Sequence, residues 1–248
     1  PPRSTPLYSS AASDVYKRQT LNPTKANIGD IICLGYSPKD GNCPSENTLA
    51  SLIVSTTRSN LDNAISPTSG NKFRLGSEQF VSLGNNSPTF NRIRTSYSFF
   101  IPTRLLNLTK GCKSEKSENS DCPQTIGFEF KAGTIFGDLP PYEAFCMGGS
   151  SSVRGWGSCD LSVSKSFVEG TAEYRFPIWK MFSGALFADV GSDLGSQDDV
   201  PGKPGKILKK SGSGFSLGGG IGIKTPIGPL RLDVASQDLS GDMRYTLG

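Results

Sequence analysis

The segment from Phe215 to Lys224 alternates between two kinds of residue, and this pattern limits the fold of the chain more than any other. One set is apolar or glycine and consists of Phe215, Leu217, Gly219, Ile221 and Ile223. The other set is mostly glycine and consists of Ser216, Gly218, Gly220, Gly222 and Lys224. Because successive side chains of a β-strand point to opposite faces, the segment predicts a strand with one apolar face and one nearly bare face. A bare face leaves space for another part of the chain to lie against its backbone.

Other segments alternate in the same way and predict an all-β chain. Residues 167–177 carry Val168, Ala172, Tyr174 and Phe176 in one parity and Glu169, Thr171, Glu173 and Arg175 in the other, and in residues 184–191 Asp189 falls on the polar side. The pattern is weaker in residues 72–75, 92–99 and 126–131. With residues 47–58 and 230–236, these segments predict about eight strands, or about nine if Ile31–Tyr36 is one. Met243–Gly248 is expected to begin a further strand.

Two kinds of fold share this pattern: a transmembrane β-barrel and a soluble β-sandwich with one wet face. The chain has no run of about eighteen apolar residues, which a membrane helix needs, but the alternating strands of a membrane barrel need no such run. Alternation does not tell the inner face of a sheet from the outer face. The pattern by itself therefore leaves both folds open.

Residues 148–156, Gly-Gly-Ser-Ser-Ser-Val-Arg-Gly-Trp, place a single arginine, Arg154, inside a loop rich in glycine and serine. An arginine keeps its charge and carries five N–H donors in a planar fork, so an enclosed Arg154 requires a carboxylate partner. The alternative is an ordinary solvated loop with a surface arginine. If the loop is enclosed, we expect it to lie on the bare face of residues 215–224.

Several short motifs surround this loop in a fixed order: Asp62–Gly70 and Leu139–Phe145 before it, and Ala172–Pro177, Phe187–Gly191, Gly218–Ile223 and Thr225–Asp233 after it. In order and spacing they resemble the C-terminal barrel of the BamA-like outer-membrane assembly and transport superfamily, the bacterial surface antigen barrel. The amino-acid sequences of Tyr174–Pro177 and Pro226–Asp233 most resemble those of the cyanobacterial or plastid-envelope branch. The resemblance covers roughly residues 45 to 248, and it is specific because several motifs agree in order.

The resemblance implies an antiparallel transmembrane β-barrel, integral to an outer membrane, of which this chain holds about eight or nine of sixteen strands. It implies that residues 20–248 are a barrel domain truncated at both ends. Such a fragment is not expected to form a stable barrel alone, because an open sheet edge in lipid leaves backbone groups unsatisfied.

The resemblance also assigns a motif that folds into the barrel lumen, made of Gly148, Gly149, Val153, Arg154, Gly155 and Trp156. The family usually has Phe or Tyr where Trp156 stands, which is a conservative change. The partner of Arg154 is then expected to be Asp189, and Glu173 is a second candidate on the polar face of the adjacent strand.

The function implied by the resemblance is the handling of polypeptides. The leading hypothesis is an assembly factor that folds and inserts β-barrel proteins into the outer membrane. The alternatives are a polypeptide secretion or envelope import pore of the same superfamily, and a passive porin or structural barrel, which has no need of the arginine loop. Expected partners are outer-membrane lipids, unfolded outer-membrane or secreted polypeptides, and periplasmic chaperones with accessory lipoproteins.

The residues themselves argue against an enzyme, a cofactor or a metal site. The chain has no histidine, which excludes Ser/His and Cys/His nucleophile systems and removes a common zinc ligand. The glycines of residues 212–222 do not match the dinucleotide-binding fingerprint, and Gly202–Lys206 lacks the spacing of a phosphate-binding loop. We interpret these glycines as a thin barrel wall and as part of an exposed loop over residues 192–214.

Residues 1–19 are expected to be foreign to the fold. Ser9–Gln19 is what a transposase-type sequencing adaptor would encode, so we predict that residues 1–19 are a disordered adaptor translation; the alternative is a genuine disordered tail. Arg3, Lys17 and Arg18 against Asp14 supply +2 of the formal net charge of +4. The near-neutral remainder gives no argument for nucleic-acid binding.

The six cysteines fall into three local pairs: Cys33 with Cys43, Cys112 with Cys122, and Cys146 with Cys159. Each pair could close a short loop and constrain the unfolded chain by about 2 to 3 kcal/mol, in a compartment that permits disulfides. The third pair would close the base of the Arg154 loop. The alternative is six unpaired thiols.

Overall fold

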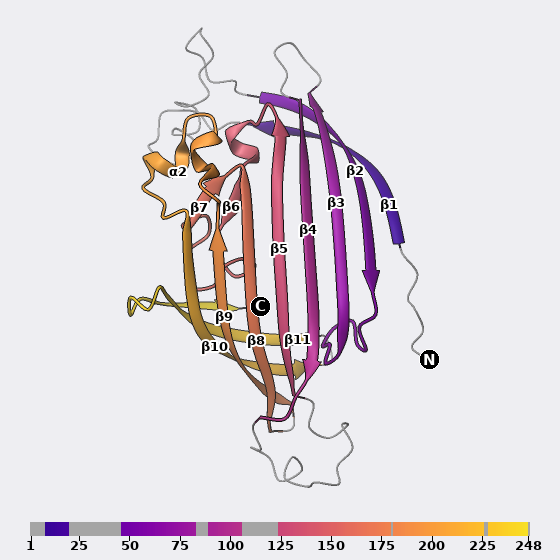
Figure 1. Ribbon diagram of the computed structural model, residues 1–248, viewed down its shortest axis with the longest axis vertical. Helices are drawn as coiled ribbons and strands as arrows, with labels where there is room; N and C mark the ends of the chain where they lie inside the picture. The colour runs from indigo at the N-terminus through magenta and orange to yellow at the C-terminus, as the bar shows by residue number, and fades with distance from the viewer. Residues whose placement is uncertain are drawn as a thin grey trace.

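The computed structural model describes residues 8–19, 46–82, 89–105, 124–179, 181–225 and 228–247. Ten strands form one antiparallel sheet, in which neighbours follow the order of the chain (Figure 1). These are β1 (Tyr8–Gln19), β2 (Glu46–Ser59), β3 (Gly70–Ser82), β4 (Thr89–Pro102), β5 (Thr125–Gly137), β8 (Ser166–Trp179), β9 (Phe182–Ser192), β10 (Ser213–Thr225), β11 (Gly228–Gln237) and β12 (Met243–Leu247). The eight strands expected from alternation are confirmed, and so is the strand that begins at Met243. Ile31–Tyr36 lies outside the described residues.

The two faces of the sheet are inverted relative to those of a soluble protein. The apolar side chains of Leu186, Val190 and Leu217 are exposed, whereas Phe187 and Asp189 of the opposite parity are buried. In a soluble sandwich the apolar set would be covered by a second sheet. An apolar outer face with a polar inner face is instead the pattern of a membrane barrel. The expected fold class, an all-β antiparallel partial barrel, is therefore confirmed.

The core lies on the inner side of the curved sheet. One cluster of buried apolar side chains comprises Phe80, Phe90, Ile135, Leu139, Phe145 and Val200, and a second comprises Met147, Val153, Trp156 and Leu161. Many of these residues belong to the segment between β5 and β8, which contains the helical turn η2 (Pro141–Glu143) and the small hairpin of β6 (Phe145–Met147) and β7 (Ser162–Ser164). This segment folds back inside the sheet, near its upper end in Figure 1.

The expectation of an exposed loop over residues 192–214 holds only in part: residues such as Leu194 and Ile207 are exposed, but others are buried. This segment contains η3 (Ser196–Asp199) and the short helix α2 (Pro204–Ile207), and Val200 is buried in the first apolar cluster. The backbone N–H of Gly212 donates to the carbonyl of Leu161 at 2.9 Å, which ties the segment to the inner hairpin. Val200 offers an apolar side chain that this cluster can cover, so the segment closes over the core. Within the described ranges, no helix is long and apolar enough to cross a membrane.

A turn at the opposite end of the sheet from α2 explains the motif Asp62–Gly70 (Figure 1). The carboxylate of Asp62 accepts hydrogen bonds from the backbone N–H of Thr68 at 2.9 Å and of Ser69 at 3.1 Å, and from the Thr68 hydroxyl. Partial burial alone would raise the pKa of Asp62, but these hydrogen bonds hold it below its ordinary value. Gly70 has φ +97° and no room for a side chain beside the Asn60 carbonyl, so glycine is required there.

Residues Tyr8–Gln19 form β1, which pairs with β2, whereas we expected residues 1–19 to be disordered. The edge of β2 offers backbone donors and acceptors that any extended segment can satisfy, so this pairing does not depend on the side chains of the segment. The adaptor origin of residues 1–19 stays a prediction, and residues 1–7 lie outside the described part of the chain.

We expect the codons for Ser9–Gln19 to be missing from the genomic DNA of the source. Long-read sequencing through the 5′ side of the reading frame measures this directly. An uninterrupted frame with a start codon upstream of an intact Pro1–Gln19 would show that the segment is native.

Candidate functional site

The Arg154 loop, residues 148–160, leaves β6, turns inward and returns to β7. Its own hydrogen bonds close it: the N–H of Gly149 donates to the Trp156 carbonyl at 3.1 Å, and the N–H of Gly148 donates to Ser152 Oγ at 3.0 Å. Gly155 has φ +89°, and a side chain there would press on Ser216 and Ala235. Glycine at position 155 thus allows the loop to approach the sheet closely.

Arg154 is buried and binds three carboxylates. Its Nε and Nη2 donate to the two oxygens of Asp189 at 2.7 and 2.9 Å. Its Nη1 donates to Glu173 Oε2 at 2.9 Å and to Asp233 Oδ2 at 3.2 Å. The backbone N–H of Arg154 also donates to Asp189 Oδ2 at 3.1 Å. The fork of the guanidinium is thereby matched to Asp189 in two parallel bonds, the strongest geometry for such a pair.

Glu173, which is only 5% exposed, is the centre of the polar network. Besides Arg154, it accepts from Arg231 Nη1 and Nη2 at 2.7 and 2.8 Å and from Arg175 Nε at 2.6 Å. Arg231 Nε also donates to Asp233 Oδ1 at 2.6 Å. Three arginines therefore face three carboxylates, and the network is electrically neutral.

The pKa of Arg154 follows from these contacts. Burial by itself would lower the pKa, because it disfavours the charged form, but Asp189 and Glu173 outweigh burial and raise it above its ordinary value. Arg154 therefore stays charged at every pH at which the protein folds, and the loop cannot be released by its deprotonation.

The ring of Phe187 forms a platform for the arginine. The guanidinium carbon of Arg154 lies 3.4 Å from the centre of this ring, which is a cation–π contact. The ring in turn lies over Gly218, where a side chain would collide with it. The bare inner face of β10 is thus filled at this point by Phe187 of β9, and Arg154 stacks on top.

The expected docking of the loop on the inner face of β10 is found further along that strand. The indole of Trp156 lies over Gly214, and its Nε1 donates to the Phe215 carbonyl at 3.2 Å. Gly155 lies against Ser216. Trp156 and Val153 belong to the second apolar cluster, so the loop is held by packing as well as by charge.

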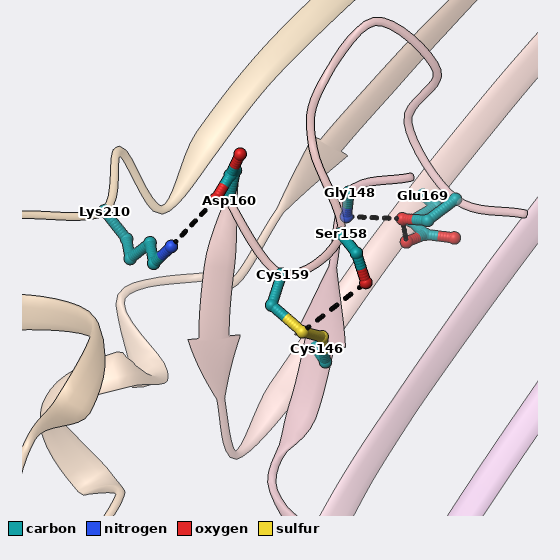
Figure 2. The surroundings of a disulfide bond; sticks show 8 residues. Cys146, Gly148, Ser158, Cys159, Asp160, Glu169 and Lys210 are labelled. Atoms are coloured by element: carbon teal, nitrogen blue, oxygen red, sulfur yellow. Dashed lines mark hydrogen bonds and ion pairs between the residues drawn. A yellow bond between two sulfur atoms is a disulfide. The ribbon is translucent and has the colours of Figure 1, made fainter. Parts of the chain in front are cut away.

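A disulfide joins Cys146 and Cys159 at the base of the loop, as Figure 2 shows, with a Cα–Cα distance of 4.7 Å. Asp160 follows directly and pairs with Lys210 at 3.2 Å and with Arg244 of β12 at 3.4 Å. The disulfide therefore fixes the point at which the loop leaves toward β7. The four cysteines 33, 43, 112 and 122 lie outside the described residues.

A second buried ion pair holds the segment that precedes the loop. Arg92 Nη2 on β4 donates to the carboxylate of Glu143 at 2.5 Å and to its carbonyl at 2.7 Å. This pair was not predicted from the sequence, although Glu143 lies in the motif Leu139–Phe145 and Arg92 has the polar parity of its strand.

A polar cavity of about 450 Å³ lies between the Arg154 loop and the Asp62 turn. Residues Ile65 and Pro67 of the turn line one side, and Ser150–Ser152 of the loop line another. Charged side chains from the strands complete the lining: Lys72, Glu129, Lys131, Glu173, Arg175 and Arg231. Among the described residues, no group of three or more potential metal ligands is close enough to hold an ion.

The structure brings together the loop arginine and both partners that the sequence suggested, Asp189 and Glu173. It adds Asp233, Arg231 and Phe187, which were not predicted to be partners from the sequence. Arg231 and Asp233 share the parity opposite to the apolar residues of their strand, and this parity could have marked them as facing the lumen. The sequence contains no signal for the register that brings them next to Glu173.

Comparisons with a family model and with known proteins point to the same family. A family model described as the Omp85 superfamily domain matches residues 7–242. Outer envelope protein 80, chloroplastic, from Arabidopsis thaliana is 39% identical over 116 residues, which cover 47% of this chain and 16% of that protein. Protein TOC75-4, chloroplastic, from the same plant is 35% identical over 175 residues, or 70% of this chain and 41% of that protein.

Among solved structures, the fold is similar to that of BamA from Haemophilus ducreyi lacking POTRA domains 1–3. The TM-score is 0.62 at 14% identity, and the match covers 97% of this chain and 49% of that one. This chain thus spans less than half the length of each of these three proteins.

We expect Glu173→Gln to be strongly destabilising, because it leaves three arginines facing two carboxylates inside the sheet. Removing one partner of a buried ion pair costs about 3 to 5 kcal/mol. The measurement is the urea midpoint of the full-length protein in detergent, followed by loss of the compact band on an unheated SDS gel.

Glu129→Gln is the matched control for this prediction. Glu129 lies on the inner face of β5 and pairs with Lys131 at 3.2 Å, with both side chains about one-third exposed (38% and 31%). Such a pair contributes about 1 kcal/mol or less. Equal midpoints for the two variants would contradict the central role of Glu173.

We expect the double variant Cys146→Ser, Cys159→Ser to fold with its loop docked and to lose about 3 kcal/mol, the value for a loop of this length. In the wild-type protein, iodoacetamide should label neither Cys146 nor Cys159 until a reductant is added, as read by peptide mass spectrometry. Labelling of both thiols without reductant would show that the disulfide does not form.

Proposed function

Because this chain belongs to the Omp85 superfamily, we propose that it is the integral outer-membrane barrel of an assembly factor that folds and inserts other β-barrel proteins. The observation that carries this proposal is the docked Arg154 loop. Burying an arginine and its partners incurs a desolvation penalty, so the buried ion pairs add little net stability. A passive porin or a structural barrel has no need of such a loop. The presence of the loop therefore supports a barrel that handles a polypeptide client.

The network gives this barrel a rigid section. Glu173 on β8, Asp189 on β9 and Asp233 on β11 are tied to one another through Arg154 and Arg231. Strands held in this way keep their register while a client polypeptide adds to a free sheet edge through backbone hydrogen bonds. In this proposal the loop is the element that keeps the wall ordered during that exchange.

The outer face suits a membrane. Apolar side chains are exposed along the strands, and Trp179 and Phe182 stack at the strand ends with ring centres 6.3 Å apart. Aromatic side chains at strand ends are typical of the interface between lipid and water. We infer that the partners are outer-membrane lipids, unfolded outer-membrane or secreted polypeptides, and chaperones or accessory lipoproteins on the inner side, with no nucleic acid.

A second candidate function is a polypeptide translocation pore, for secretion or envelope import. The polar cavity between the Arg154 loop and the Asp62 turn favours it, because charged side chains such as Lys72, Glu129 and Arg175 line a route along the inner wall. An extended hydrophilic polypeptide passes more readily along such a wall than along an apolar one.

The test uses the full-length protein in liposomes with an unfolded β-barrel client. We expect the wild type to speed client insertion, read as protease-resistant and heat-modifiable client, and Arg154→Ala or Asp189→Ala to slow it at least about 10-fold, since each removes one side of a buried pair. A client that enters the liposome lumen without inserting would select the translocation pore instead.

The control is Arg74→Met, which removes an exposed arginine of β3 that is not part of the Arg154 network. It should keep at least about half of the insertion rate. Exchanging the charges of residues 154 and 189 should not restore activity, because an acidic residue at position 154 would face Glu173 and Asp233. Normal insertion by both single variants would overturn the proposal.

A further inference from the structure

The inner face of β10 is bare where the side chains of its two neighbours meet. In the sheet register, Gly218 pairs with Phe187 of β9 and Gly220 pairs with Asp233 of β11. The Phe187 ring lies over Gly218, and a side chain on Gly220 would fall against Asp233 Oδ1. Groups from β9 and β11 therefore touch the same arginine across a strand that contributes no side chain of its own at these points.

Two arginines make this bridge. Arg154 binds Asp189 of β9 and, at 3.2 Å, Asp233 of β11. Arg231 of β11 binds Glu173 of β8 with both Nη atoms, at 2.7 and 2.8 Å. The loop is thus joined to β11 by charged contacts between side chains that are at most about one-quarter exposed, where solvent screens them less than at the surface.

A weaker contact reaches the next strand. Arg244 of β12 pairs with Asp160 at 3.4 Å, with both side chains about half exposed (51% and 45%). Such a pair contributes about 1 kcal/mol or less. Asp160 is held in place by the neighbouring disulfide at Cys159 and by Lys210 (Figure 2). The base of the loop therefore contacts β12 as well, the strand that pairs with β11.

We propose that Asp233 and Arg231 are positioning residues that couple docking of the Arg154 loop to the order of the neighbouring strands β11 and β12. Undocking of the loop loosens the sheet at this edge, and loosening of the edge weakens docking by the same factor, because coupling between two sites is reciprocal. Gly218 and Gly220 are what permit the coupling. The significance for client addition rests on the proposed function, but the coupling itself does not.

Hydrogen exchange of the full-length protein in lipid nanodiscs tests the coupling without any client. Peptides covering residues 148–160 report on the loop, and peptides covering residues 228–247 report on β11 and β12. We expect Arg154→Lys, which cannot make the forked contact, to raise exchange at least about 5-fold in both regions. Asp233→Asn, which changes a residue of β11 and not of the loop, should also raise exchange in both regions. Faster exchange in the loop with no change in β11 and β12 would overturn the inference.

A second pair of variants keeps every charge in place. The methyl group added by Gly220→Ala points inward and collides with Asp233. The methyl group added by Gly219→Ala points outward and lies at ordinary contact distances, 3.4 Å from the Ala185 carbonyl and 3.5 Å from Leu186. We expect Gly220→Ala to raise exchange in the loop, and Gly219→Ala to leave the loop at the wild-type rate. Equal loop exchange in the two variants would show that β10 does not transmit the coupling.

The insertion assay separates this inference from the proposed function. Coupled exchange together with unchanged client insertion would leave the coupling in place and refute its role in assembly. Uncoupled exchange together with slowed insertion in the Arg154 variants would refute the coupling and leave the assembly function in place.

Discussion

The buried charge of Arg154 is the constraint on which the rest of the site depends. An arginine does not become neutral inside a protein, so each neighbouring element has to supply a carboxylate, a ring face or space for it. Asp189 supplies the forked contact, Glu173 and Asp233 share Nη1, and Phe187 lies under the guanidinium. The glycines of β10 and the disulfide at the base of the loop follow from the same need, since both allow the loop to reach this position and to keep it.

The inverted faces of the sheet explain why the core lies inside the curve. A soluble protein buries its apolar face, but here the apolar face is turned outward, and the inner face would be left to water and charge. The chain fills that side with its own insertion between β5 and β8 and with the segment that contains Val200. Arg92 and Glu143 fasten the insertion at one point and Arg154 fastens it at another. The loop is therefore part of a packed body, and the polar cavity lies between this body and the Asp62 turn.

Much of the wall could be predicted from the sequence, because a period of two is a local property. The family resemblance assigned Asp189 as the partner of Arg154, and the polar parity of Glu173 made it a second candidate, before the distances of either to Arg154 were known. Asp233 could not be found in this way, because its contact with Arg154 depends on the register of β10 against β11, and alternation does not set register between strands. The burial of Val200 was missed for a related reason. A segment rich in glycine, lysine and proline predicts a solvated loop unless the apolar cluster that covers one of its residues is known.

The network defines a position more than it adds stability. Three arginines and three carboxylates cancel in charge, and a buried ionic cluster of this kind is often no more stable than an apolar core of equal volume. Its effect is to make one position of the loop much more favourable than its neighbours, because a shift of the loop by one residue would leave Arg154 without its forked contact to Asp189 and Glu173 without one of its three arginine partners. A loop held in this way is either docked or undocked, with little between. Under the proposed function, the docked state is the one that keeps β8, β9 and β11 in register while a client strand adds to the sheet.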